Sequence, residues 1–358
     1  MFTINEEELS EKKAQHVKCS QCDGAVEFDP AKNKMVCLYC GSEYDVVSNN
    51  APITTTKLAD ELVGKKEVVK GLSTMIHCND CGAEILTDAT QVINVCTFCN
   101  SRLIVENKEY EMIPPDALIP FKVSKTEVEA NFKQWIKKKR FAPNKLRSAK
   151  QASQIQGVYL PYWAFDTKVD VEYHGMRGDY YNTKETYWQN GTTKQRDKRK
   201  VRWKKARGNL TKEFKNILIP ASGKEGSNFI KKLEPFQFKE LVPYQNDYLA
   251  GLSAERYQID LSDSWKAAQG KVIPAIKASI ETDIGGDTTK EIEYQTSYTH
   301  PQFKHLLLPI WINSYSYKGK TYHYFVNGQS GKVVGAAPKS PLKITLLAIA
   351  ILILIILI

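Results

Sequence analysis

Eight cysteines are the residues of this sequence whose type and spacing most clearly point to chemistry. All of them lie before residue 100, and each belongs to a Cys-x-x-Cys pair. The pairs form two sets that repeat with a period of 59 and have the same fourteen-residue gap: Cys19, Cys22, Cys37 and Cys40, then Cys78, Cys81, Cys96 and Cys99. Two such knuckles place four thiolates around one tetrahedral Zn²⁺. The spacing therefore predicts two zinc ribbons that bind one ion each.

Zinc bound by four cysteines is usually structural, because no coordination position remains for water or substrate. We expect the two ions to stabilise ribbons that are too small to fold on an apolar core alone. Gly41 and Gly82 follow the second cysteine of a pair, where a knuckle favours a left-handed backbone, and Asn100 can take that role in the last pair. In the first pair Asp23 stands in that position and displaces the glycine.

The positive charge of the chain is concentrated in one segment. The formal net charge is +10, and the segment from Lys194 to Arg207 contains nine basic residues and one acidic residue. Asn190-Gly191, just upstream, is typical of a tight hairpin turn and predicts two strands. On a strand, six of the basic residues would share one face: Lys194, Arg196, Lys198, Lys200, Arg202 and Lys204. We predict that these six residues bind an anionic partner. The alternative is a solvated edge strand made basic to avoid aggregation.

The sequence contains no recognisable catalytic motif. Gly328 to Lys332 is too short for a phosphate-binding loop and lacks the following Ser or Thr, and neither Gly-x-Ser-x-Gly nor His-Glu-x-x-His occurs. We therefore predict that the protein is not an enzyme.

The rest of the chain reads as aromatic-rich strands broken by two helices. Ser124 begins a capping box and a helix to about Arg140, and a second helical stripe follows Ser262, where Pro274 can kink or interrupt it. One phrase of apolar residues around a proline occurs twice in each half: Leu118-Ile119-Pro120-Phe121, Tyr159-Leu160-Pro161-Tyr162-Trp163, Leu241-Val242-Pro243-Tyr244 and Leu307-Leu308-Pro309-Ile310-Trp311. This repetition predicts a tandem duplication of an α+β unit.

The last fifteen residues, 344–358, include Thr345 as their only polar residue. A helix that is apolar all round favours a membrane anchor over a core helix, although about 22 Å of helix is short for a hydrocarbon core of about 30 Å. Lysines on the N-terminal flank of this segment would keep the globular part cytoplasmic. The N-terminus shows no secretory signal. We therefore expect a single-pass protein of the cell membrane that contacts lipid through its C-terminal helix.

The predicted fold class is multidomain, with two small β zinc ribbons, a duplicated α+β domain and one C-terminal transmembrane helix. The predicted order is a tail (1–14), zinc ribbon 1 (15–48), a linker (49–72), zinc ribbon 2 (73–110), the duplicated domain (114–335), a basic linker (336–343) and the membrane anchor (344–358).

Three further stretches accompany the twin cysteine ribbons: Leu160-Pro161-Tyr162-Trp163-Ala164-Phe165-Asp166, residues 244–251 and residues 326–332. Together these features resemble a bacterial family of membrane-anchored double zinc-ribbon proteins, commonly labelled as having a transcription-factor-IIB-type zinc ribbon or as similar to the primosomal helicase. The resemblance covers nearly the whole chain. It implies recruitment of phage shock protein A, a membrane-stress protein beside which some members are encoded. The helicase label is not supported, because no nucleotide-binding motif accompanies the ribbons.

The function expected from the sequence is a membrane-tethered zinc-ribbon adaptor that recruits a membrane-stress protein. Because a tether would bring the basic face close to an anionic leaflet, lipid or an acidic protein is the preferred partner. One alternative is a nucleic-acid-binding protein that uses the ribbons and the basic face of residues 194–207. A third is an enzyme whose pocket the sequence does not reveal.

Overall fold

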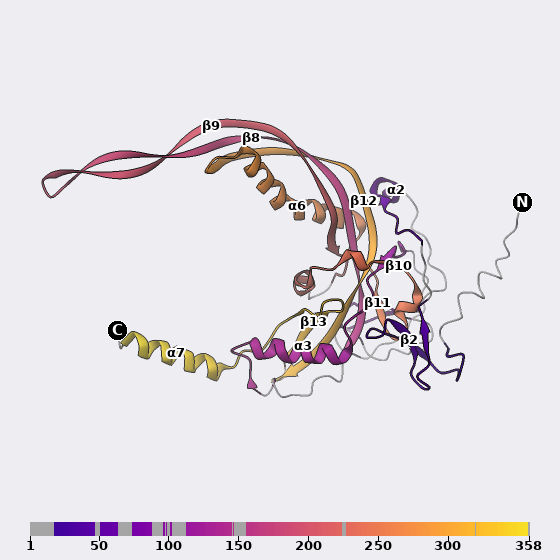
Figure 1. The fold of residues 1–358 in the computed structure, drawn as a ribbon. Coiled ribbons are helices and arrows are strands. Elements are labelled where there is room, and N and C mark those ends of the chain that lie inside the picture. The colour runs from indigo at the N-terminus through magenta and orange to yellow at the C-terminus, as the bar shows by residue number, and fades with distance from the viewer. Residues whose placement is uncertain are drawn as a thin grey trace, which may run out of the picture.

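Three long strands dominate the computed structural model, which describes residues 18–46, 51–63, 74–87, 96, 98, 101, 112–144, 146, 155–223, 227–318 and 320–356. They are β8 (Gln156–Gln189), β9 (Thr192–Pro220) and β12 (Thr288–Tyr317). β8 pairs antiparallel with β9 along one edge and with β12 along the other. The three strands curve together as an arch, and the β8–β9 hairpin extends beyond the other described elements (Figure 1).

The sequence explains why the middle of the arch is its core. From Val158 to Phe165 every residue of β8 is buried, as expected for a strand covered on both faces. Farther along, buried and exposed residues alternate, which is typical of a strand with one covered face. Beyond Tyr180 no residue of β8 is buried. The hairpin therefore leaves the core where the buried residues of β8 end.

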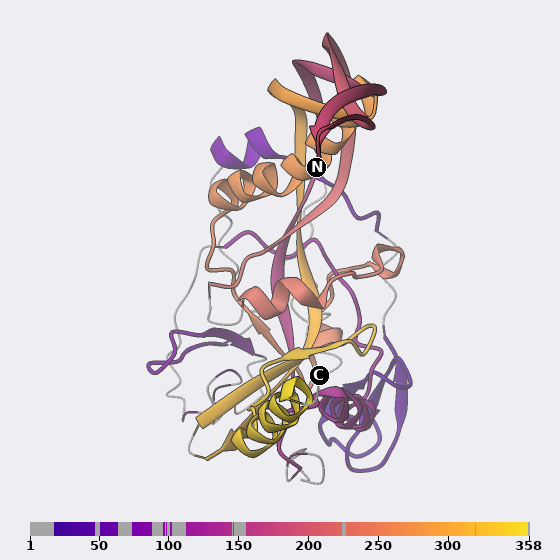
Figure 2. The same ribbon diagram turned by 90° about the vertical axis from the view of Figure 1, so that its left-hand side faces the viewer.

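Helix α6 (Leu261–Ile284) covers one face of this curved sheet (Figures 1 and 2). Its buried stripe, which includes Val272, Ile276 and Ile280, packs against apolar side chains such as Val169 and Val171 of β8. The helix continues through Pro274, so the predicted second helix is present without interruption there.

Helix α3 (Lys125–Lys138) begins at the predicted capping box. The Ser124 side chain accepts from the backbone N–H of Glu127, and the Glu127 carboxylate accepts from the backbone N–H of Ser124. Its Phe132 ring stacks on Tyr324 of β13 (Lys320–Asn327) with ring centres 4.1 Å apart. The capping signal and the apolar stripe thus located this helix correctly.

The shorter elements surround the long strands. β1 (Val26–Asp29), β2 (Lys34–Cys37) and β3 (Glu43–Asp45) form a separate antiparallel sheet. The hairpin of β5 (Thr74–His77) and β6 (Glu84–Thr87) joins the large sheet through β11 (Ser253–Glu255), which runs parallel to β8. The remaining elements are β4 (Thr56–Lys57), α2 (Leu58–Val63), β7 (Ala117–Leu118), α5 (Ser227–Ile230), η2 (Lys231–Leu233), η3 (Phe238–Glu240), β10 (Val242–Pro243), η4 (Asn246–Leu249), β14 (Val333–Gly335) and α7 (Pro341–Ile356).

The repeated proline phrases meet in the middle of the large sheet. Leu160 of β8 pairs with Leu308 of β12, while Leu118 of β7 pairs with Leu307 on one side and Val242 on the other. Segments far apart in the sequence thereby contribute adjacent strands to one buried region.

The structure corrects the predicted fold class. The described chain is mostly β-sheet with few helices, with eleven strands in its large sheet, so an α+β domain is the wrong description. The predicted transmembrane helix is also wrong, because no helix within the described ranges is both long and apolar enough to cross a membrane. α7 has 16 residues, or about 24 Å of helix against a hydrocarbon core of about 30 Å. This finding overturns 344–358 as a membrane anchor and the single-pass localisation at the cell membrane.

Some predictions fall on residues that the structure does not describe. The N-terminal tail (1–14), Cys99 and Asn100 lie outside the described ranges. The boundaries proposed for the ribbons, the linkers and the main domain stay predictions.

Candidate metal centres and basic arm

The first four cysteines converge on one point. Cys37 is the last residue of β2, and turns on both sides of the β1–β2 hairpin bring up Cys19, Cys22 and Cys40. The Sγ atoms of Cys19 and Cys40 are 3.4 Å apart, those of Cys22 and Cys37 are 3.5 Å apart, and all four lie within 4.8 Å of one another. A tetrahedral ion with Zn–S bonds of about 2.3 Å requires sulfurs roughly 3.8 Å apart. The four thiolates therefore fit one Zn²⁺.

Backbone geometry explains how each pair of cysteines turns toward the ion. The N–H groups of Asp23 and Gly41 donate to the carbonyls of the first cysteines of their pairs, at 2.8 Å and 3.0 Å. Both residues have a left-handed backbone, with φ of 58° and 76°. Asp23 thus adopts the conformation for which glycine was expected, which an Asp side chain tolerates better than most.

Hydroxyl side chains stabilise two thiolates of the first set, those of Cys19 and Cys40, and no motif in the sequence predicted these contacts. The hydroxyl of Tyr44 lies 3.1 Å from the Sγ of Cys19, and that of Ser42 lies 3.1 Å from the Sγ of Cys40. The Tyr44 hydrogen bond lowers the pKa of the Cys19 thiol to about 6. Because a metal binds the thiolate and not the thiol, these hydroxyls favour the ligand form.

The second set repeats the arrangement for the three of its cysteines that are described. Cys78, Cys81 and Cys96 have Sγ atoms within 4.8 Å of one another, and those of Cys81 and Cys96 are 3.6 Å apart. Gly82 has φ of 70° and donates its N–H to the Cys78 carbonyl at 2.7 Å, as in the first set. Both sets can hold a metal ion, and zinc matches their thiolate chemistry.

The predicted basic residues lie on a projecting two-stranded ribbon. β12 accompanies β8 only as far as Gly178, so residues 179–202, here called the arm, contain β8 and β9 alone. The turn at its tip is Asn190-Gly191, as predicted, with φ of 52° and 75°. The sixth predicted residue, Lys204, lies at the base of the arm. The other five lie on the arm at alternate positions of β9: Lys194, Arg196, Lys198, Lys200 and Arg202.

Aromatic side chains lie between these cations. Register places Tyr187 opposite Lys194 and Tyr181 opposite Lys200, on the same face of the ribbon. Arg196 lies 5.1 Å from the ring centre of Tyr187, while on the other face Arg199 lies 5.2 Å from that of Tyr180. Trp188, next to the turn, is 74% exposed. The arm thus presents both positive charge and exposed rings.

Acidic residues of β8 neutralise only part of this charge. Glu185 pairs with Arg196 at 2.7 Å and also contacts Lys198, while Asp179 lies 3.9 Å from Lys204. Lys200 has no ion pair within the described parts of the chain. Seven basic and three acidic residues leave the arm with a net charge of +4.

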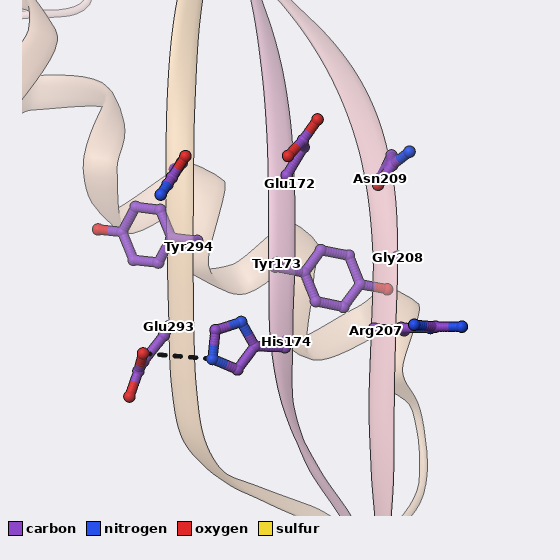
Figure 3. A pocket seen from close by; sticks show the side chains of 9 residues that line it. Glu172, Tyr173, His174, Arg207, Gly208, Asn209, Glu293 and Tyr294 are labelled. Carbon is purple, nitrogen blue, oxygen red and sulfur yellow. Dashed lines mark ion pairs between the residues drawn. The ribbon is translucent and has the colours of Figure 1, made fainter.

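A hollow beside the base of the arm is lined by charged, polar and aromatic side chains. Figure 3 shows side chains from β12, β8 and β9, with His174 and Glu293 joined as an ion pair at 3.2 Å. These two side chains are 68% and 77% exposed, so solvent screens their interaction. Glu172, Tyr173 and Arg207 line the same hollow, so it contains carboxylate, imidazole, phenol and guanidinium groups.

Comparison with known proteins gives one relative and no activity. The chain is 30% identical over 241 residues to a Bacillus subtilis (strain 168) protein described as "Uncharacterized protein YdjG". The match covers 65% of this chain and 66% of the relative, just under two thirds of the relative's length. No family model and no solved structure matches. Nothing in these comparisons indicates an enzyme.

Proposed function

We propose that this protein is a non-enzymatic adaptor, with zinc-stabilised ribbons, that binds an anionic macromolecule on its basic arm. The observation that carries this proposal is the projection of the arm, with its row of cations and exposed rings, beyond every other described element (Figure 1).

The role of zinc in this proposal is structural. Four thiolates complete a tetrahedral site in the first set, so an ion there has no free position for a substrate. In the second set we propose Cys99 as the fourth ligand, by its spacing. The two ions then supply folding energy to the segments around them, and the binding function belongs to another part of the chain.

A purely protective role explains the arm less well. Basic residues on an edge strand do discourage edge-to-edge aggregation. Protection, however, does not require a ribbon that leaves its core, since an isolated two-stranded hairpin is only marginally stable in water. It also does not account for Trp188, because an exposed ring near the tip adds an adhesive surface. An arm that binds a partner accounts for both features.

The proposal is tested by capture of cellular partners on the tagged full-length protein and on two charge-reversed variants. The arm variant is Arg196→Glu, Lys200→Glu and Arg202→Glu. The control is Lys125→Glu, Lys133→Glu and Lys137→Glu on exposed positions of α3, which changes the net charge equally.

A component that is captured by the wild type and the control but lost from the arm variant supports the adaptor. Equal capture by all three proteins refutes a binding role for the arm. Mass spectrometry of the captured material also tests phage shock protein A, the partner implied by the family resemblance. Zinc content and circular dichroism check that all three proteins are folded.

A further inference from the structure

We infer that the anionic partner of the arm is a double-stranded nucleic acid, and that the arm lies along a groove of the duplex. This inference rests on the proposed binding role of the arm and specifies its partner. Lipid and acidic protein were preferred because a membrane tether was expected, and no helix within the described ranges is long and apolar enough to cross a membrane. The shape, the charge and the exposed rings of the arm must therefore decide among anionic partners.

The arm has the cross-section and length for a groove. Two strands about 4.8 Å apart form a ribbon, and the major groove of B-form DNA, about 12 Å wide, admits such a ribbon. From Asp179 to Asn190 the chain advances eleven residues, or about 36 Å at roughly 3.3 Å per residue. This length is close to one helical turn of DNA, about 34 to 36 Å. No other described element pairs with the arm along this length.

The charge of the arm is arranged as a row. Cations recur at every second residue of β9 from Lys194 to Lys204, or about every 6.6 Å. A uniform linear polyanion such as a nucleic acid backbone can contact every member of such a row, and each contact releases condensed counterions. A protein interface instead has a core depleted of charge, whereas the two rings on this face, Tyr181 and Tyr187, are separated by the charged pair of Glu185 and Arg196.

Trp188 adds a contact that charge alone does not provide. It lies two residues before Asn190, and its parity places it on the face of the ribbon opposite the cation row. Proteins that bind the minor groove of DNA insert apolar side chains between base steps, and exposed aromatic rings stack on unpaired bases. A ring at the tip of a basic ribbon therefore suits a partner that offers stacked bases beside its charges.

The test measures the binding of full-length protein to a fluorescein-labelled DNA duplex of about three helical turns, by anisotropy, between about 50 and 200 mM salt. The arm variant Arg196→Gln, Lys200→Gln and Arg202→Gln should bind at least tenfold more weakly. Its plot of log affinity against log salt should be shallower by nearly three, because each lost phosphate contact contributes about 0.9. Trp188→Ala should lose about tenfold in affinity with the same salt slope as the wild type.

The matched control, Lys125→Gln, Lys133→Gln and Lys137→Gln, should bind like the wild type. Identical affinity and slope for the arm variant and this control would overturn the inference. Labelled polyglutamate separates the two proposals: if it binds in an arm-dependent way and duplex DNA does not, the nucleic acid inference fails and the adaptor stands. If neither polymer binds through the arm and cellular capture is also unchanged, both fail.

Discussion

The guanidinium carbon of Arg202 lies 5.3 Å from the centre of the Tyr181 ring, on the facing strand of the arm. Tyr181 is directly opposite Lys200, so the arginine reaches diagonally across the ribbon to the ring. Because the arm has no apolar core, cross-strand side-chain contacts of this kind add to the backbone ladder that holds its two strands in register.

Removing the Tyr181 ring should loosen the arm without unfolding the body. A cation–π contact at an exposed site contributes about 0.5 to 1 kcal/mol, so Tyr181→Ala should make the arm open two- to fivefold more often. Trypsin, which cuts after the many arm Lys and Arg residues, should then cleave within 179–202 correspondingly faster. Tyr181→Phe keeps the ring and should cleave at the wild-type rate. Equal cleavage of Tyr181→Ala and wild type would show that the contact does not stabilise the arm.

The two cysteine sets should bind two zinc ions per chain. Inductively coupled plasma mass spectrometry of the purified protein should give this ratio, and Cys37→Ser should reduce it to one. Gln21→Ala, which changes an exposed side chain beside the same site, serves as the control and should keep both ions. A ratio that stays at two in Cys37→Ser would contradict the first site.

Tyr44→Phe should weaken zinc binding while leaving all eight cysteines in place. The hydroxyl that stabilises the Cys19 thiolate is lost, and loss of such an outer contact typically costs 10- to 100-fold in affinity. Competition with a chromophoric chelator measures this change. Tyr39→Phe is the matched control, because the Tyr39 side chain is 79% exposed and its hydroxyl donates to none of the described cysteine sulfurs.

His305 should make the stability of the fold sensitive to acid. Burial lowers the pKa of its imidazole to about 4, against about 6.5 for an exposed histidine. Below pH 6.5 the His305 imidazole binds a proton in the unfolded chain but stays neutral in the folded chain. The contribution of neutral His305 to the free energy of unfolding is therefore complete above pH 6.5 and is lost as the pH falls toward 4. The full difference corresponds to about 3 kcal/mol.

Urea denaturation at pH 7.5 and pH 5 measures this loss, with His305→Gln as the comparison. The wild type should lose more free energy of unfolding than the variant over this interval, by about 2 kcal/mol. Any acid-induced loss of zinc affects both proteins alike and cancels in the difference. Parallel losses in the two proteins would mean that His305 is not the responsible group.

Local signals in the sequence located local structure. The capping box at Ser124, the hairpin turn at Asn190-Gly191 and the left-handed positions at Gly41 and Gly82 each depend on a few neighbouring residues, and each is present in the structure. The convergence of the first four cysteines likewise follows from their spacing and the hairpin between them. In these cases the residues that determine the local geometry lie close to one another in the sequence.

Long-range pairing was not recoverable in the same way. β8 has 34 residues, far more than a typical strand of five or six, and its partner β12 begins about a hundred residues after β8 ends. No local periodicity encodes that pairing, so the sequence suggested an α+β domain instead of a large sheet. Nor could it show that Tyr44 reaches the sulfur of Cys19. The apolar run of α7 suggested a membrane span because composition outweighed its short length.

The pairing order of the long strands also affects how the protein is made. β8 and β9 are joined by a tight turn, so their hairpin can close soon after residue 220 has been synthesised. The opposite edge of β8 awaits β12, which ends at Tyr317. At about 5 to 20 residues per second, this edge stays uncovered for roughly 5 to 20 s on the ribosome. The buried run from Val158 to Phe165 is therefore the segment most at risk of aggregation during synthesis, so slowing translation after residue 220 should lower the yield of folded protein.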